Sequence, residues 1–253
     1  MISVLLSLAF LPDVVSQRST ENESSSSQSS TGKSSFWTDL RNSSEMALRP
    51  ELWPLLTVKV VSGVASSMYL TVLPIVLTQE PIQLDPAQLG MNMSAMGLGN
   101  ALFGVVGAAF LTKKLGGAMG LSQVGLVLRP CFTFLVLVVV SNVSQSTTIR
   151  NHILASIIGV SVLHSLTTHA LATGLTTQTT GAVAAQEQGA LLGLEHGLFS
   201  LARIGGPTIG TFVFIQFSFA HVAMACGVLD CLLLALLMKT SARIAGGQKA
   251  KGR

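Results

Sequence analysis

Residues 52–77, LWPLLTVKVVSGVASSMYLTVLPIVL, form an apolar stretch in which Lys59 is the one charged residue. About 20 apolar residues suffice for a helix to cross the roughly 30 Å hydrocarbon core of a bilayer. Five similar stretches follow it, with approximate bounds 89–111, 118–140, 152–175, 190–214 and 219–238. The sequence therefore predicts an all-α integral membrane protein whose six transmembrane helices form a bundle over residues 52–238.

The composition of the whole chain agrees with this class. Only 10% of its 253 residues are charged and 49% are hydrophobic, whereas soluble domains carry about 25% charged residues. The net charge of +4 does not indicate a nucleic-acid partner, because Lys and Arg gather at span ends and in the tails rather than on one basic face. Cys131, Cys226 and Cys231 fall inside apolar segments and are expected to be packing residues.

The segments before the spans have a different character. Residues 1–11 are apolar but too short to cross a bilayer, so they are either the remnant of a preceding helix or an interfacial segment. Residues 12–51 contain the Ser-rich tract 24–30 and predict a disordered cytoplasmic linker, in which residues 37–51 can form a short helix at the membrane surface.

Positive charge outside the spans predicts the orientation of the chain. Lys and Arg gather in the N-terminal segment, in the turn at Lys113 and Lys114, and in the basic tail 239–253, while the opposite loops hold only Arg150. Short loops rich in Lys and Arg face the cytoplasm. The prediction is a multi-pass protein with both termini cytoplasmic, in either the plasma membrane or an organelle membrane.

Charged residues inside the spans are costly and therefore mark structural pairs or functional sites. At about 1.5 Å per residue along a helix, Arg129 and Asp230 lie at matching depth, which predicts a buried structural ion pair. Lys59 and Glu195 also share a depth, nearer the cytoplasmic face. They can pair if their helices are neighbours; otherwise Lys59 extends to the interface.

Three further features of the spans are candidates for function. Arg203 lies mid-span with no acid at matching depth, so it contacts either a substrate or a partner in a larger assembly. His164, with Thr167 and Thr168 one turn away, is either part of a proton relay or hydrogen-bonded between helices. The run Gly205-Gly206-Pro207 is expected to loosen its helix and to allow close packing.

The chain lacks the residue patterns of catalysis. It shows no nucleophile with its base, no paired catalytic carboxylates, no phosphate loop and no cluster of metal-ligand residues. We therefore expect no enzyme activity, no cofactor and no metal site.

Five stretches resemble the major facilitator superfamily. QEQGALLGL at 186–194 and SLARIGGPTIG at 200–210 are similar to the loop and eleventh helix of its drug:proton antiporter branch. KKLG at 113–116 stands where the superfamily has its basic loop between helices eight and nine, although the Asp-Arg character of that loop is replaced by Lys-Lys. TVKV at 57–60 and QLDPAQLG at 83–90 resemble a tetracycline-transporter-like, organic-cation-transporter-like branch.

This resemblance implies a specific architecture. The superfamily has twelve helices in two six-helix halves, each built from two inverted three-helix repeats, and this chain would supply helices seven to twelve. Residues 1–11 would then end helix six, and the Ser-rich segment would join the halves. Helix seven neighbours helix eleven and lines the cavity with helix ten, which would bring Lys59 near Glu195 and expose His164, Thr167 and Thr168 to the pathway.

The resemblance also implies a function. It predicts a transmembrane transporter of small organic solutes or organic cations that works by alternating access as a proton-coupled antiporter. The expected substrate and ion pathway consists of Lys59, His164, Thr167, Thr168, Glu195 and Arg203. The alternative is a transport-inactive half that acts as a membrane interaction protein, paired with a missing N-terminal half or a second copy. The expected partners are the lipid bilayer, a small organic solute and H⁺.

Overall fold

The computed structural model describes residues 45–141 and 147–251. The chain divides into a unit of residues 1–44 and a unit of residues 45–253, and the helical bundle belongs to the second unit. The expected segment 1–11 and the Ser-rich tract lie outside the described residues. Within the described ranges there are six helices long and apolar enough to cross a membrane, and no strand. This confirms the predicted all-α membrane class.

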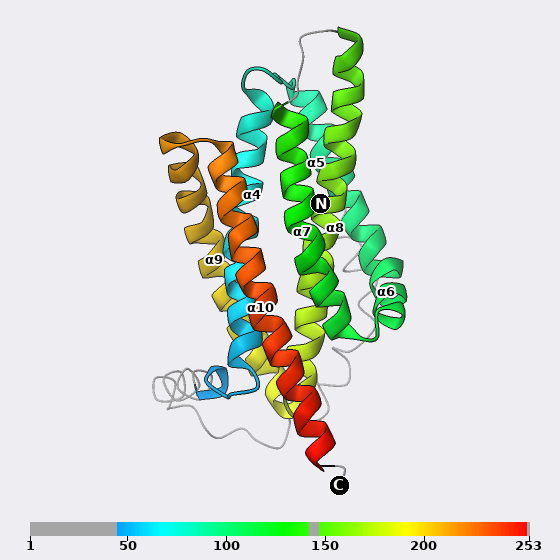
Figure 1. Ribbon diagram of the computed structural model, residues 1–253, viewed down its shortest axis with the longest axis vertical. Coiled ribbons are helices and arrows are strands. Elements are labelled where there is room, and N and C mark those ends of the chain that lie inside the picture. Colours follow the sequence, from blue (N-terminus) through cyan, green and yellow to red (C-terminus); the bar gives the residue numbers. More distant parts are fainter. Residues whose placement is uncertain (1–44, 142–146, 252–253) are drawn as a thin grey trace, which may run out of the picture. The chain divides into compact units, whose positions relative to one another are not determined.

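The six spans are built from seven α-helices and one π-helical turn (Figure 1). In chain order they are α4 (Trp53–Thr78), α5 (Pro86–Leu102), the π-helical turn η1 (Phe103–Gly107), α6 (Ala108–Lys114), α7 (Ala118–Ser141), α8 (Thr147–Gly181), α9 (Gln188–Gln216) and α10 (Phe219–Lys251). A short 3₁₀ turn, η2 (Ala185–Glu187), precedes α9. Because α5, η1 and α6 follow without a break, they form one span.

Local chemistry explains where two of these helices begin and end. The Asp85 carboxylate accepts a hydrogen bond from the Gln88 backbone N–H, and the Gln88 side chain accepts one from the Asp85 N–H, so α5 begins at Pro86. The sequence predicts that the fourth span ends near residue 175, but α8 continues to Gly181. Thr176 and Thr180 donate their hydroxyls to carbonyls four residues earlier, so these polar side chains find partners within the helix itself.

The neighbour relations of the helices follow an internal symmetry. Helix α4 packs against α9 and α10, α8 packs against α5 and α7, and α7 also packs against α10. Exchanging α4 with α8, α5 with α9, and α7 with α10 gives the same set of neighbours. Each group of three helices begins on the opposite side of the membrane from the other, so the bundle consists of two inverted three-helix repeats.

The packing of α4 against α9 depends on glycine. A Cβ at Gly206 would lie 2.6 Å from the Cβ of Ser67, and one at Gly210 would lie 2.8 Å from the Cα of Met68. The two helices can therefore approach closely only where α9 has no side chain. Helix α9 is continuous through Pro207, so the expected loosening at Gly205-Gly206-Pro207 does not interrupt the helix and stays a prediction.

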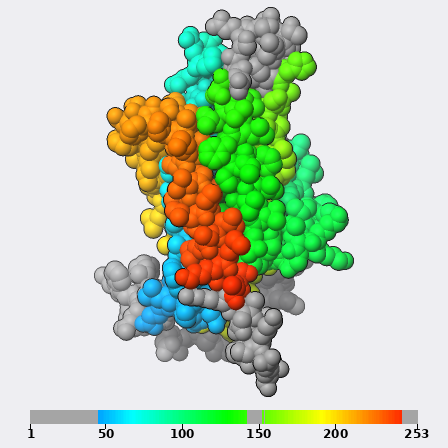
Figure 2. Space-filling view, in the orientation of Figure 1, coloured from blue at the N-terminus to red at the C-terminus, as the bar shows by residue number. Residues whose placement is uncertain are grey.

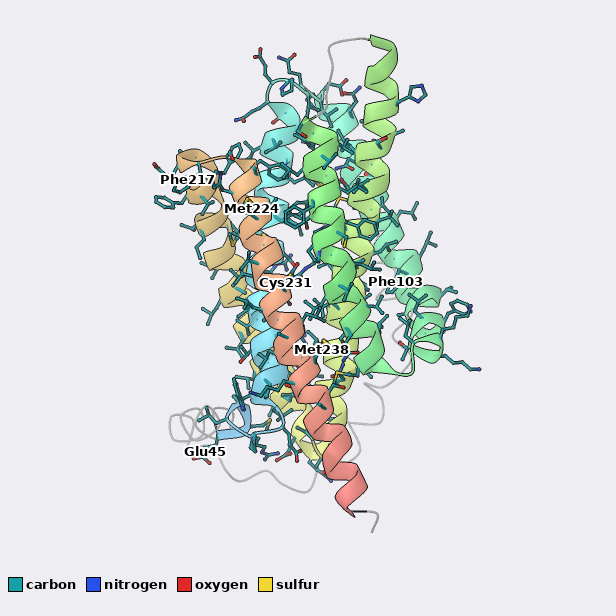
Figure 3. All side chains as sticks on the ribbon, viewed as in Figure 1. Glu45, Phe103, Phe217, Met224, Cys231 and Met238 are labelled. Carbon is teal, nitrogen blue, oxygen red and sulfur yellow. The ribbon has the colours of Figure 1, made fainter. Side chains whose placement is uncertain are left out.

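Apolar side chains fill the centre of the bundle and also cover its outside. The largest buried cluster joins Leu73 of α4, Val136 of α7, Ile157 of α8 and Val222 of α10. In the view of Figure 2, α7 and α10 fill the middle of the face, with α9 along one side. Met224, Cys231 and Met238, exposed on α10, repeat every seven residues along it (Figure 3). Such an outer stripe suits contact with lipid.

Candidate functional site

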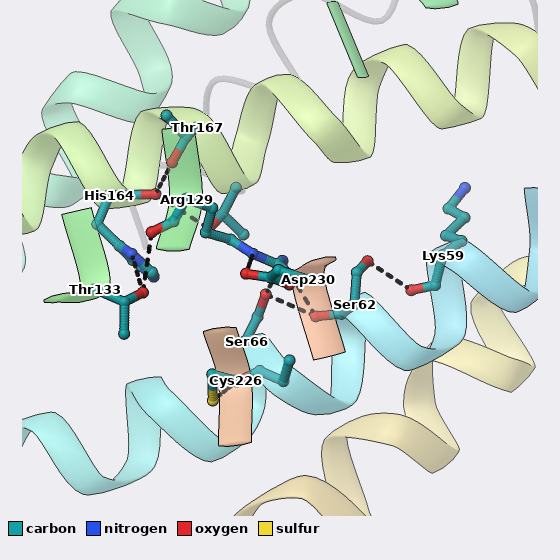
Figure 4. A network of polar contacts seen from close by, with 11 residues as sticks. Lys59, Ser62, Ser66, Arg129, Thr133, His164, Thr167, Cys226 and Asp230 are labelled. Atoms are coloured by element: carbon teal, nitrogen blue, oxygen red, sulfur yellow. Dashed lines mark hydrogen bonds and ion pairs between the residues drawn. The ribbon is translucent and has the colours of Figure 1, made fainter. Parts of the chain in front are cut away.

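Among the described residues, two polar clusters built around ion pairs lie inside the bundle, and both include α4. The central cluster consists of Ser62, Ser66, Arg129, Thr133, His164 and Asp230, from α4, α7, α8 and α10 (Figure 4). The Lys–Glu cluster consists of Lys59, Thr176, Thr179 and Glu195, from α4, α8 and α9. Each cluster connects helices of both repeats.

An ion pair between Arg129 and Asp230 dominates the central cluster. Arg129 Nε donates to Asp230 Oδ2 at 2.9 Å and Nη2 donates to Oδ1, so the guanidinium holds both carboxylate oxygens. The two side chains are only 2% and 1% exposed. A pair this deeply buried is stable only if its remaining donors and acceptors are also satisfied.

Helix α4 supplies hydrogen-bond acceptors for the remaining donors of Arg129. Arg129 Nη1 donates to the Ser66 hydroxyl at 2.9 Å and to the Ser62 carbonyl at 3.3 Å. Ser66 in turn donates to the Ser62 carbonyl, and Ser62 donates to the Lys59 carbonyl. The guanidinium therefore joins α7, α10 and α4 at one point, which Figure 4 shows.

His164 borders the central cluster and is buried rather than exposed to a pathway. Its Nδ1 lies 3.3 Å from the Thr133 hydroxyl, and its ring stacks on Tyr69 at 4.2 Å between centroids. The hydroxyls of Thr167 and Thr168 bond to the His164 carbonyl on their own helix. His164 is 2% exposed and Thr167 is 8% exposed, so this conformation does not present them to a cavity as the resemblance implied. Thr133 of α7 and Tyr69 of α4 enclose the His164 ring.

In the Lys–Glu cluster, the structure brings together two residues that are 136 positions apart. Lys59 Nζ donates to Glu195 Oε2 and, at 2.7 Å, to the Thr176 hydroxyl. The Thr179 hydroxyl donates to the other carboxylate oxygen of Glu195. The Glu195 side chain is 3% exposed and that of Lys59 is 13% exposed. This ion pair is therefore somewhat more open than the Arg129–Asp230 pair.

Arg203 belongs to neither cluster. It is exposed on α9, and its guanidinium carbon lies 5.7 Å from the centre of the Phe199 ring. Neighbouring Leu201 and Ile204 are 65% and 71% exposed. A cation at mid-span is costly where it meets lipid tails, so this part of α9 suits contact with water or with another protein.

Two groups were not anticipated from the sequence. Arg49 makes a two-pronged ion pair with Glu187, at 2.8 and 2.6 Å, which ties the segment before α4 to the turn before α9. The Glu187 carboxylate raises the pKa of Arg49 above its usual value. Tyr69, 1% exposed, lies between the rings of His164 and Phe219. No sequence signal distinguished Tyr69 from a packing residue, whereas the equal distance of Arg49 and Glu187 from a span end was a usable signal.

Comparison with known proteins finds sequence similarity to a solute carrier. No protein-family model and no solved structure matches it. It is 26% identical over 238 residues to solute carrier family 22 member 18 of Mus musculus, which covers 92% of this chain and 54% of that protein. It is 26% identical over 200 residues to the Rattus norvegicus protein of the same name, covering 78% of this chain and 45% of that protein.

These two similarities extend over most of the chain but over only part of each relative. The chain spans about half the length of the curated relatives it matches. Together with the six apolar helices, they support an integral, multi-pass membrane protein that is distantly related to a transporter.

Proposed function

We propose that this chain is the six-helix half of a secondary transporter that moves small organic solutes, organic cations among them, across a membrane. The observation that carries the proposal is the similarity to a solute carrier over 92% of the chain, because buried ion pairs alone also occur in purely structural bundles. The inverted repeats support it, since many secondary transporters are built from such repeats and change access by moving one against another.

The two polar clusters have different roles in this proposal. The Arg129–Asp230 pair, whose guanidinium also bonds two groups of α4, is a fixed structural joint. The Lys–Glu cluster is the exchangeable site, because its ammonium and carboxylate are joined to hydroxyls that can change partners and its lysine is more exposed. Proton coupling and antiport are assigned to this second cluster. His164 is assigned to the structural joint, because its ring contacts Thr133 beside Arg129.

Arg203 is assigned to the aqueous pathway on the exposed face of α9. A guanidinium stacked on Phe199 keeps several N–H donors free of the ring plane, which suits a carboxylate or another hydrogen-bond acceptor on a solute.

The proposed orientation follows from the positive charge of the short loops and tails, which puts both termini in the cytoplasm.

The proposal is tested with the full chain reconstituted into liposomes. A pH gradient is imposed, and uptake of tetraethylammonium and of tetracycline is measured, with empty liposomes as the blank. We expect uptake that depends on the gradient and that falls at least tenfold in Arg203→Ala, while Arg49→Ala, changed outside the spans, behaves as the unsubstituted chain. Uptake equal to that of empty liposomes, from a chain shown to be inserted and folded, would refute transport by this chain alone.

A second function is favoured by one observation, the match to about half of each relative. In this alternative the chain is inactive by itself and acts as a membrane interaction protein that pairs with another six-helix unit. The same liposomes then show no uptake, and cross-linking of a cysteine introduced at Leu201 captures a partner in membranes where the chain is expressed. A chain that transports as a monomer excludes this alternative.

A further inference from the structure

The Glu195 carboxylate has an unusual set of partners for a buried acid. It lies about eight residues into α9, about 10 Å along the helix from its start. Its two oxygens accept from different groups: Oε2 from the Lys59 ammonium and Oε1 from the Thr179 hydroxyl. One partner is charged and one is a neutral hydroxyl, so only half of the carboxylate depends on an ion pair.

The Thr179 hydroxyl can serve both an ionised and a neutral Glu195. A hydroxyl carries one proton and can donate it to one acceptor at a time. Besides Glu195, two carbonyls of its own helix lie within reach, Leu175 O at 3.1 Å and Thr176 O at 3.0 Å. If Glu195 is protonated, Thr179 can turn its proton to one of these carbonyls and accept a hydrogen bond from the new carboxylic acid. Both states are then fully bonded.

The Lys59 ammonium also keeps a partner in both states. It donates to the Thr176 hydroxyl at 2.7 Å, and that hydroxyl donates onward to the Ala172 carbonyl at 2.9 Å. Neutralising Glu195 therefore removes one hydrogen-bond partner from Lys59 but does not strand the ammonium. The 13% exposure of the Lys59 side chain leaves it a route to solvent.

The central cluster lacks these devices. Both oxygens of Asp230 are held by one guanidinium, and arginine stays charged in proteins. The Ser66 hydroxyl in this cluster accepts from the Arg129 guanidinium and does not bond the Asp230 carboxylate. Protonating Asp230 would leave a buried, permanent cation without its counter-ion, which is strongly unfavourable. Of the two ion pairs, only Lys59–Glu195 leaves its carboxylate partners that suit both the ionised and the neutral form.

We propose that Glu195 is the proton-binding site of this protein, and that its protonation and deprotonation drive the transport cycle. In the step, H⁺ from water bonds to a Glu195 oxygen; no other covalent bond forms or breaks, and the cluster changes from neutral to a charge of +1. The assignment to a transport cycle rests on the proposed function, whereas proton binding itself does not. A loss of the ion pair would weaken the tie between α4 and α9, which belong to different repeats.

The charged groups around Glu195 are few in the part of the chain that the structure describes. Helix α4 contributes Lys59, and α8 contributes hydroxyls but no titratable contact. On α10, Asp230 is bonded to Arg129. On α9 itself, His196 is exposed, and Glu187, just before the helix, is bonded to Arg49.

The test reads the proton directly by infrared spectroscopy of the full chain in lipid nanodiscs. As the pH is lowered, we expect the C=O stretch of a buried carboxylic acid to appear. The isosteric variant Glu195→Gln, which keeps the shape of the side chain, should lack this band. The control Glu80→Gln, the same substitution at an exposed residue outside the spans, should retain the band.

A second variant separates proton binding from a general change in folding. Thr179→Val has the shape of threonine without the hydroxyl, so the band should remain but move to the higher frequency of a less strongly bonded acid. The proposal is overturned if no band appears in the unsubstituted chain, or if Glu195→Gln leaves the band unchanged.

Failure of the function and failure of the proton site give different results. In liposomes, Glu195→Gln should lose acceleration of uptake by a pH gradient while retaining exchange of solute at equal pH. If the unsubstituted chain shows the infrared band but no uptake, the proposed function fails and the proton site stands. If uptake is coupled to the gradient but the band persists in Glu195→Gln, the function stands and Glu195 is not the site.

Discussion

Removing Asp230 tests whether the Arg129–Asp230 pair is a structural joint. In Asp230→Ala, Arg129 loses two charge-assisted hydrogen bonds while 2% exposed. Such bonds contribute about 1.5–3 kcal/mol each, so the variant should lose about 3–6 kcal/mol of unfolding free energy. This agrees with the roughly 3–5 kcal/mol that breaking one partner of a buried ion pair costs.

The double variant Arg129→Leu, Asp230→Leu supplies the control. It removes both charges and keeps an apolar filling, and replacing buried ion pairs in this way is often neutral or stabilising by about 1–4 kcal/mol. Part of that gain is lost in this protein, because Ser66 then has no guanidinium to accept from. We expect the double variant to be clearly more stable than Asp230→Ala.

The assay is reversible unfolding in mixed micelles with increasing SDS, followed by far-ultraviolet circular dichroism. The decisive quantity is the coupling energy from a double-mutant cycle that includes both single leucine variants. A loss below about 1 kcal/mol in Asp230→Ala, the level of an exposed pair, would contradict the buried joint. A double variant as unstable as the sum of its singles would show that the two side chains act independently.

Three further outcomes are expected. Gly206→Val should destabilise the bundle by about 1–3 kcal/mol in the same assay, the range for overpacking, because its side chain would meet Ser67 and the α4 backbone; Gly205→Val, at a site with no heavy atom within 4 Å, is the matched control. Ser66→Ala should cost about 1.5–3 kcal/mol, as for a hydrogen bond to a charged group, and a change under about 0.5 kcal/mol would contradict that bond. Arg49→Ala should leave the unfolding midpoint unchanged but speed amide hydrogen exchange in residues 45–52, and unchanged exchange would show that this exposed ion pair does not hold the segment.

The sequence could predict the spans and the depths of their charges, because both depend only on position along the chain. Arg129 and Asp230 lie mid-span on helices of opposite direction, and in the structure they meet. Lys59 and Glu195 meet as well. That pairing could be predicted only if their two helices were known to be neighbours, which composition and spacing do not tell.

The hydroxyl partners could not be predicted from the sequence. Ser62, Ser66 and Thr179 are small residues of a kind that transmembrane helices use everywhere. Which of them faces a charge depends on the rotation of each helix about its axis, and that rotation is set by packing against several neighbours at once. For the same reason, the burial of His164 against Tyr69 depends on how α8 packs against α4 and α7 rather than on any local pattern.

The π-helical turn η1 has a consequence for the seam between α5 and α8. Before it, Asn100 donates a hydrogen bond to the Ser165 hydroxyl of α8, and Met96, four residues earlier, is buried. After it, the next buried residue is Ala108, five positions beyond Phe103. The wide turn thus absorbs a one-residue surplus in the sequence. Deleting either valine at 105 or 106 would turn the span into an ordinary α-helix without rotating Lys113 and Lys114, in its last turn, away from their present side.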